Sequence, residues 1–332
     1  MESKVNYDPF SQTYSVTYPF IEDPSILPDN KGQVIKIAER EEKHLLKCGL
    51  LRDFNEEFNK MLQYGALVEL SPAELEMWDG PTHCVSLQHV LNDKSTTTPL
   101  RIVTNSSLSN RHGLSLYSIL MKGPNTLSDQ WDVLHRLRSY EVALCSDVTK
   151  ACYSLRTGEV EKHVRRVCWR YGQVGSDWRV FAFTTVSFGD IPAATFLEIT
   201  IKDTADRNNH IDPEAASRIR RDRFVDDLST GGSPLQVSRF VGCESDNFQC
   251  DGTIPTILSR GSLCLKAIVI SGETNQDKIS KLGGKVLGLS WDPTTDEISV
   301  ELNVSLNTKH DGKLLLSLAT LSTIDTSLTH CT

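Results

Sequence analysis

The spacing of apolar positions along the chain changes from helical to strand-like after Gly65. Apolar side chains recur at roughly helical intervals between Val34 and Cys48, and Gly49 is placed to end that helix. The stretch Asp53–Glu56 fits a capping box, which predicts a second helix that starts there and ends near Gly65. Residues 1–30 are polar and contain four prolines, so we expect an extended arm rather than a domain.

Beyond Gly65, short apolar runs predict strands and amphipathic segments predict helices. We expect strands over 66–70, 84–87, 100–104, 142–147, 178–185 and 263–270, a hairpin over 285–302, and helices over 127–137, 158–168, 193–206 and 213–221. Strands and helices mix without strict alternation. This order favours an α+β fold with an antiparallel sheet.

Length and composition describe an ordinary globular protein. A chain of 332 residues can form two or three packed subdomains. We find no run of 18 apolar residues and no apolar segment after the N-terminus, which predicts a cytoplasmic protein with no membrane partner. The nine cysteines are scattered without a CxxC pair and are expected to be reduced core thiols, with Cys243 and Cys250 a poor zinc site.

The charge distribution is uneven. A net charge of −8 argues against a simple nucleic-acid binder. Two basic clusters nevertheless occur, one over 162–170 and one over 218–223. Such clusters are usually solvated faces, but the second immediately precedes a pair of aspartates, so contact with nucleic acid stays open as the alternative.

The chemistry is concentrated in three aspartates. Asp226 and Asp227 follow an aromatic and a β-branched residue, and Asp147 stands where an apolar run ends. Adjacent carboxylates repel each other and favour a cation such as Mg²⁺, which accepts one or two carboxylates together with substrate phosphates. A strand-end aspartate with a hairpin pair is the ligand set of two-metal phosphoryl transfer. The plainer alternatives are a helix N-cap at Asp147 and an exposed turn at the pair.

The order of the motifs resembles the reverse transcriptase domain of Pao/BEL-type LTR retrotransposon Pol polyproteins, over roughly residues 15–303. The matching segments are Phe224–Asp227, Ser146–Lys150, Thr98–Ser107, Val186–Gly189, Trp169–Arg170, Val286–Pro293 and, more weakly, Ser262–Lys266. The resemblance implies a right-hand polymerase fold with its thumb absent or truncated. The implied divisions are an arm (1–30), fingers (31–138), palm (139–157), a fingers insertion (158–184), palm again (185–283), a primer-grip-like hairpin (284–303) and a tail or thumb remnant (304–332).

The resemblance also assigns roles to individual residues. Asp147, Asp226 and the Val148 carbonyl would hold two Mg²⁺ ions, with Mn²⁺ as the substitute, and Asp227 would support them. Arg101 would bind the triphosphate, and Lys266 is a candidate general acid for pyrophosphate. Gly189 would let the backbone approach the new base pair. The implied activity is RNA-directed DNA synthesis on an RNA or DNA template-primer from dNTPs, alongside other Pol domains and in the cytoplasm, a virus-like particle or the nucleus.

The sequence departs from the family pattern at several positions. Cys152 stands where reverse transcriptases usually carry the aromatic ring that excludes a ribose 2′-hydroxyl, and Tyr153 follows it. Ala194 and Ser86 replace expected prolines, and we recognise no protease, RNase H or integrase segment. A domesticated or degenerate fragment is therefore expected. The alternatives are a catalytically inactive nucleic-acid-binding remnant and an unrelated α+β protein with a coincidental Asp-Asp turn.

Overall fold

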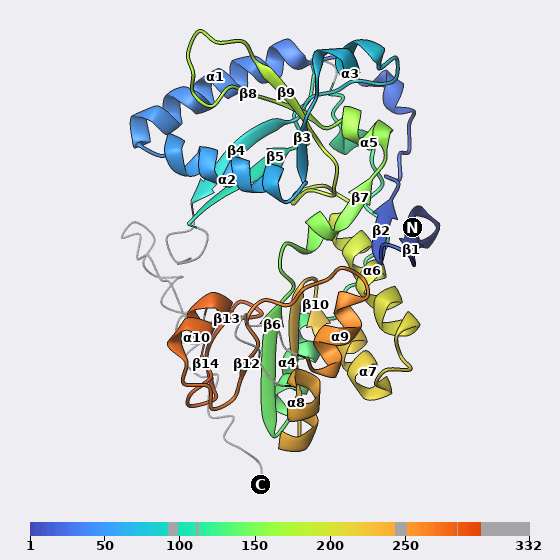
Figure 1. Cartoon of the computed structure of the whole chain (residues 1–332), viewed down its shortest axis with the longest axis vertical. Coiled ribbons are helices and arrows are strands. Elements are labelled where there is room, and N and C mark those ends of the chain that lie inside the picture. The colour runs from blue at the N-terminus through green and yellow to red at the C-terminus, as the bar shows by residue number, and fades with distance from the viewer. Residues whose placement is uncertain (92–98, 111–112, 243–250, 284, 300–332) are drawn as a thin grey trace, which may run out of the picture.

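The computed structural model describes residues 1–91, 99–110, 113–242, 251–283 and 285–299. Its helices and short sheets form an upper and a lower lobe joined by a narrower central part (Figure 1). The fold class is α+β, as the sequence predicts. None of the described helices is both long and apolar enough to cross a membrane. The expected tail over 304–332, the end of the 284–303 hairpin, and Cys243 and Cys250 lie outside the described residues.

The upper lobe packs two long helices against small antiparallel sheets. Helix α1 ends at Gly49, whose φ of +72° is a left-handed conformation that glycine adopts easily. The elements are α1 (Lys31–Cys48), α2 (Leu51–Gln63), β3 (Leu67–Glu69), α3 (Pro72–Met77), β4 (Ser86–Leu91), β5 (Leu100–Asn105), α5 (Glu159–His163), β8 (Arg166–Trp169) and β9 (Arg179–Phe183). The sheet order is β3-β9-β8, and β4 pairs separately with β5.

The first part of the N-terminal arm is a hairpin at one side of the molecule, between the lobes (Figure 1). Strand β2 (Thr13–Val16) pairs with β1 (Val5–Asp8) on one side and, in parallel, with β7 (Leu155–Thr157) on the other. Helix α6 (Ala193–Arg207) lies beside this sheet (Figure 1). Single-turn 3₁₀ helices complete the described chain at Glu2–Lys4, Pro24–Ile26, Tyr117–Ile119 and Ala151–Ser154.

The lower lobe is built on a four-stranded antiparallel sheet of order β10-β11-β6-β12. The elements are α4 (Gln130–Arg138), β6 (Val142–Asp147), α7 (Pro213–Arg221), β10 (Arg223–Phe224), β11 (Asp227–Gly232), α8 (Pro234–Val241), α9 (Thr253–Ser259), β12 (Val269–Ile270), α10 (Gln276–Leu282), β13 (Lys285–Val286), β14 (Leu289–Asp292) and β15 (Glu297–Ser299).

Strand β6 is buried on both faces because its side chains alternate between two cores. Leu144 packs into a cluster with apolar residues of α6, α7, α8 and α9. Its neighbours Ala143 and Cys145 pack into a different cluster, with residues of α4 and the β13–β14 hairpin. Five of its six residues are apolar or small, which matches this central position.

Several boundaries differ from the sequence prediction. The predicted capping box at Asp53 is wrong, because α2 begins at Leu51 and Asp53 lies within its first turn. The helix predicted over 158–168 is only five residues long, and the chain then forms β8. The strand predicted over 263–270 forms only at β12, although Leu265 makes an isolated bridge to Val148. In both segments the available strand partner decides the outcome: β8 forms because it pairs with β9, and β12 is short because only Val269 and Ile270 pair with β6.

Candidate active site

The register of the lower sheet brings the three predicted aspartates to one place. Asp147 ends β6 and pairs directly with Asp227, the first residue of β11. Phe224 pairs with Asp227 across the β10–β11 hairpin, so Val225 and Asp226 form its two-residue turn. The Val148 amide donates to the Asp226 carbonyl over 2.9 Å, which ties the turn to the end of β6.

The turn that carries Asp226 contains a strained residue. Val225 has a φ of +56°, a region that β-branched residues rarely adopt and that glycine would normally occupy in a hairpin turn. Strain of this kind costs on the order of 1–3 kcal/mol and persists where the surroundings enforce it, most often at functional sites. The observation therefore favours a functional turn over a merely exposed one.

The three carboxylates are electrostatically coupled. Burial, and then the charges of Asp226 and Asp227, raises the pKa of Asp147 to about 7. Burial and the charge of Asp226 raise the pKa of Asp227 to about 6, and burial also raises the pKa of Asp226. The buried Oδ1 atom of Asp147 has no hydrogen-bond partner. An unsatisfied carboxylate oxygen among like charges is a position that a cation would stabilise.

Two predicted cationic residues act on this group from different elements. The positive charges of Lys266 and Arg101 partly oppose the rise in the pKa of Asp147, and Arg101 also opposes the rise in the pKa of Asp226. Lys266 is half-buried, and its amide donates to the Asp147 carbonyl over 2.7 Å. Arg101 is exposed on β5 of the upper lobe, so its charge reaches the aspartates from the opposite lobe.

The predicted glycine turn lies against the strand that carries Arg101. Gly189 has a φ of +101°, and a Cβ atom there would lie 3.4 Å from the Thr104 carbonyl oxygen. The Thr104 hydroxyl donates to the Phe188 carbonyl over 3.4 Å. A side chain at Gly189 would therefore be strained by its own backbone conformation and by the approach of Thr104.

Cys152 and Tyr153 lie on the 3₁₀ helix that follows Asp147. Cys152 is buried, and burial, followed by the charges of Asp226 and Asp190, raises the pKa of its thiol to about 12. Tyr153 is half-buried, and its ring meets Phe188 edge-on with centroids 5.6 Å apart. The charge of Asp226 thus acts on Cys152, while Tyr153 packs against Phe188 of the glycine turn.

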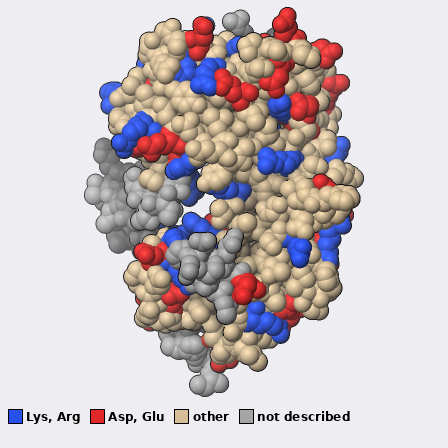
Figure 2. Space-filling view, viewed as in Figure 1, with Lys and Arg blue, Asp and Glu red and all other residues tan. Residues whose placement is uncertain are grey.

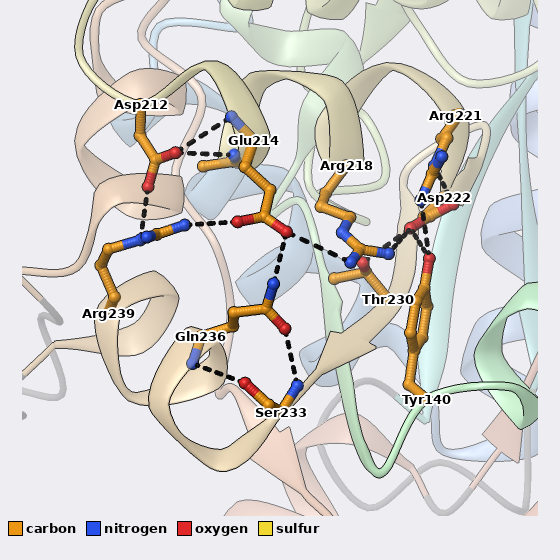
Figure 3. A network of polar contacts seen from close by, with 11 residues as sticks. Tyr140, Asp212, Glu214, Arg218, Arg221, Asp222, Thr230, Ser233, Gln236 and Arg239 are labelled. Atoms are coloured by element: carbon orange, nitrogen blue, oxygen red, sulfur yellow. Dashed lines mark hydrogen bonds and ion pairs between the residues drawn. The ribbon is translucent and has the colours of Figure 1, made fainter.

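Most side chains of the two basic clusters are buried. The clusters are therefore neither solvated faces nor exposed nucleic-acid contacts, the two interpretations that the sequence left open. In the first cluster, Arg165 is fully buried, and Arg170 pairs with the buried Glu42 over 3.0 Å. In the second, Arg223 is buried against Glu198 at 2.6 Å. Arg218, Arg221 and the fully buried Asp222 form the network drawn in Figure 3, with Tyr140, Thr230, Asp212, Glu214, Ser233, Gln236 and Arg239.

Metal binding would need ligands beyond the carboxylates. Within the described part of the chain, no group of three or more His, Cys, Asp or Glu side chains could hold a metal ion by itself. Two carboxylates with a backbone carbonyl and substrate phosphates remain a suitable set for Mg²⁺. Two surface hollows, of about 300 and 430 Å³, are lined by residues other than these aspartates.

Figure 2 shows a hollow between the upper and lower lobes with Lys and Arg side chains on its rim.

Two buried carboxylates, Asp190 and Asp222, are not among the predicted site residues, although each lies at the centre of a polar network. Nothing in the local sequence marks them, because their partners come from distant segments.

No protein-family model and no curated protein matches this chain.

Proposed function

We propose that this chain is a template-directed DNA polymerase of the reverse transcriptase type, with a right-hand arrangement of fingers and palm. One observation carries the proposal: Asp147 and Asp227 are register partners on neighbouring strands, and Asp226 lies in the turn between β10 and β11. Asp147 and Asp227 are 80 positions apart in sequence, so their convergence is not a consequence of local structure. The resemblance to Pao/BEL-type Pol proteins supports the same assignment.

The side chains present suit a pair of magnesium ions. Asp147, Asp226 and the Val148 carbonyl would hold them, and the unpartnered Asp147 Oδ1 with its raised pKa is a position that a cation would stabilise. When bound, such ions increase the acidity of a primer 3′-hydroxyl and stabilise the charge that develops on pyrophosphate. Asp227 supports the site from its position opposite Asp147.

The remaining residues would bind and orient the nucleotide. Arg101 reaches the aspartates electrostatically from the upper lobe and would pair with triphosphate oxygens through its planar guanidinium. Lys266, on the other side of Asp147, would donate a proton to the leaving group. The backbone at Gly189 would contact the new base pair, beside the strand that carries Arg101.

Primer extension tests the proposal directly. Wild-type protein with Mg²⁺, dNTPs and an RNA-templated DNA primer is expected to extend the primer, whereas Asp226→Ala should abolish extension. Asp132→Ala, which removes an exposed aspartate of α4, is the matched control and should extend normally. Equal extension by wild type and Asp226→Ala would reject the site. Steeply salt-dependent binding to template-primer without incorporation would instead identify an inactive nucleic-acid-binding protein.

A further inference from the structure

One buried carboxylate outside the aspartate group gathers donors from four separate segments. The side chain of Asp190 is fully buried. It accepts hydrogen bonds from the Tyr18 hydroxyl, from Arg165 Nη1 at 3.0 Å and from the Ser106 hydroxyl at 3.2 Å. It also accepts from the amide of Ser187 at 3.1 Å and from its hydroxyl at 2.9 Å. Five donors on one carboxylate make this a fully satisfied polar network.

The donors come from parts of the chain that lie far apart in the sequence. Tyr18 belongs to the N-terminal arm, Ser106 follows β5, and Arg165 precedes β8. Arg165 is itself held in place, because it also donates to the carbonyls of Glu161 and Thr185. Asp190 therefore fixes its own turn to three elements at once.

The turn held in this way is the one that contains Gly189. Ser187, whose amide and hydroxyl both bind Asp190, lies two residues before Gly189. The Thr104 hydroxyl of β5 lies 3.4 Å from both the Ser187 hydroxyl and the Phe188 carbonyl. These contacts hold the glycine turn against the strand of Arg101.

We propose that Asp190 is a positioning residue for the nucleotide, because its buried network fixes the glycine turn against the strand that carries Arg101. This inference rests on the proposed polymerase function. Loosening the network would let the turn move relative to Arg101. Nucleotide binding would then weaken, while the aspartates that perform the chemistry stay in place.

Asp190→Asn is the informative change, since it keeps the shape of the side chain and removes its charge. Glu42→Gln is the matched control: Glu42 is also buried and also accepts from an arginine, Arg170, but it lies in α1. Both variants should lose stability. Only Asp190→Asn should raise the KM for dNTP, by about tenfold with kcat changed less, because misplacement of a binding group weakens positioning.

Hydrogen–deuterium exchange provides a readout that does not need catalysis. The peptide spanning 185–190 should exchange faster in Asp190→Asn than in wild type, and it should be unchanged in Glu42→Gln. If Asp190→Asn does not fold, Ser106→Ala and Tyr18→Phe each remove one donor and should produce the same changes in smaller degree.

The outcomes separate the two proposals. Unchanged exchange in the 185–190 peptide, or a KM for dNTP that rises equally in Glu42→Gln, would overturn the role of Asp190. A wild-type protein that extends no primer would reject the proposed polymerase function. In that case, faster exchange of the 185–190 peptide in Asp190→Asn but not in Glu42→Gln would still support the positioning of the turn.

Discussion

At the scale of the residue, burial and like charge dominate the candidate site. The pKa of Asp147 is raised to about 7, against 3.8 for an unperturbed aspartate, because the folded protein disfavours its ionised form. The stability that this group contributes is therefore fully present below pH 3.8 and is lost as the pH rises through about 7. At neutral pH the ionised site therefore destabilises the folded state unless a cation neutralises it.

Replacing Asp147 by Asn should accordingly stabilise the metal-free protein at pH 8. We expect the free energy of unfolding to rise by about 1–3 kcal/mol, a value reduced from the full pKa shift because the site is partly solvated. Urea denaturation at pH 8 measures it. Mg²⁺ should stabilise the wild type by binding the folded state, but not Asp147→Asn. A variant less stable than wild type without Mg²⁺ would contradict the electrostatic argument.

His163 provides a pH-dependent contribution of the opposite sign. It stacks on Trp78 with ring centroids 4.0 Å apart, and burial, followed by the charges of Arg166 and Lys162, lowers its pKa to about 4. Its stabilising contribution is therefore present above about pH 6.5 and is lost as the pH falls toward 4.

On going from pH 7 to pH 4.5, the free energy of unfolding should decrease less in His163→Phe than in wild type. The difference between the two decreases should be about 1–2 kcal/mol. Urea denaturation at several pH values measures the difference. The matched control is His210→Phe at an exposed position, which should follow the wild-type curve. If both variants followed the wild type, the neutral state of His163 would not contribute to stability.

At the scale of the element, the pairing of β6 with β11 determines where Asp227 lies. The far end of this pair is tightly packed: a Cβ atom at Gly231 would lie 2.3 Å from the Val142 carbonyl oxygen and 2.7 Å from the Tyr140 Cβ. No side chain fits there without a shift of the strand. A buried glycine within a strand often marks such a close approach.

Gly231→Ala should therefore destabilise the protein by about 1–3 kcal/mol through overpacking and should reduce primer extension by displacing β11. Thermal denaturation and the extension assay measure the two effects. Gly32→Ala is the control, because a Cβ atom at that position in α1 would meet nothing within 4 Å. It should be neutral or stabilising by up to about 1 kcal/mol. Normal stability of Gly231→Ala would show that β11 can shift freely.

At the scale of the whole molecule, many of the clustered arginines serve the fold rather than a ligand. Arg170 pairs with the buried Glu42, stacks on Trp178 at 4.3 Å and is itself mostly buried. On the proposed function, nucleic acid would instead meet the rim of the hollow between the lobes, where Lys and Arg gather (Figure 2). This arrangement is compatible with a net charge of −8, because binding requires only local positive potential.

Arg170→Ala should lower the free energy of unfolding by about 3–5 kcal/mol, since it leaves a buried carboxylate unpaired. It should leave the salt dependence of template-primer binding unchanged, because the guanidinium of Arg170 is mostly buried against Glu42 and Trp178. Denaturation and fluorescence anisotropy over a series of salt concentrations measure the two properties. A decrease of about 1 in the slope of log K against log salt would show that Arg170 does contact nucleic acid.

The sequence by itself determined the features that depend on near neighbours. The apolar run before Asp147 specified β6, and Gly49 and Gly65 marked the ends of α1 and α2. These features follow from local propensity and from the alternation of buried side chains, which can be read within a short window.

Only the tertiary structure decided which distant residues meet. The register that pairs Asp147 with Asp227, the five donors around Asp190 and the burial of Arg165 all join segments far apart in the chain. An arginine in a polar stretch has the same local sequence whether it faces solvent or a buried carboxylate. Its environment depends on long-range packing, and so the sequence alone could name the aspartates of the candidate site but could not tell which arginines are buried against distant carboxylates.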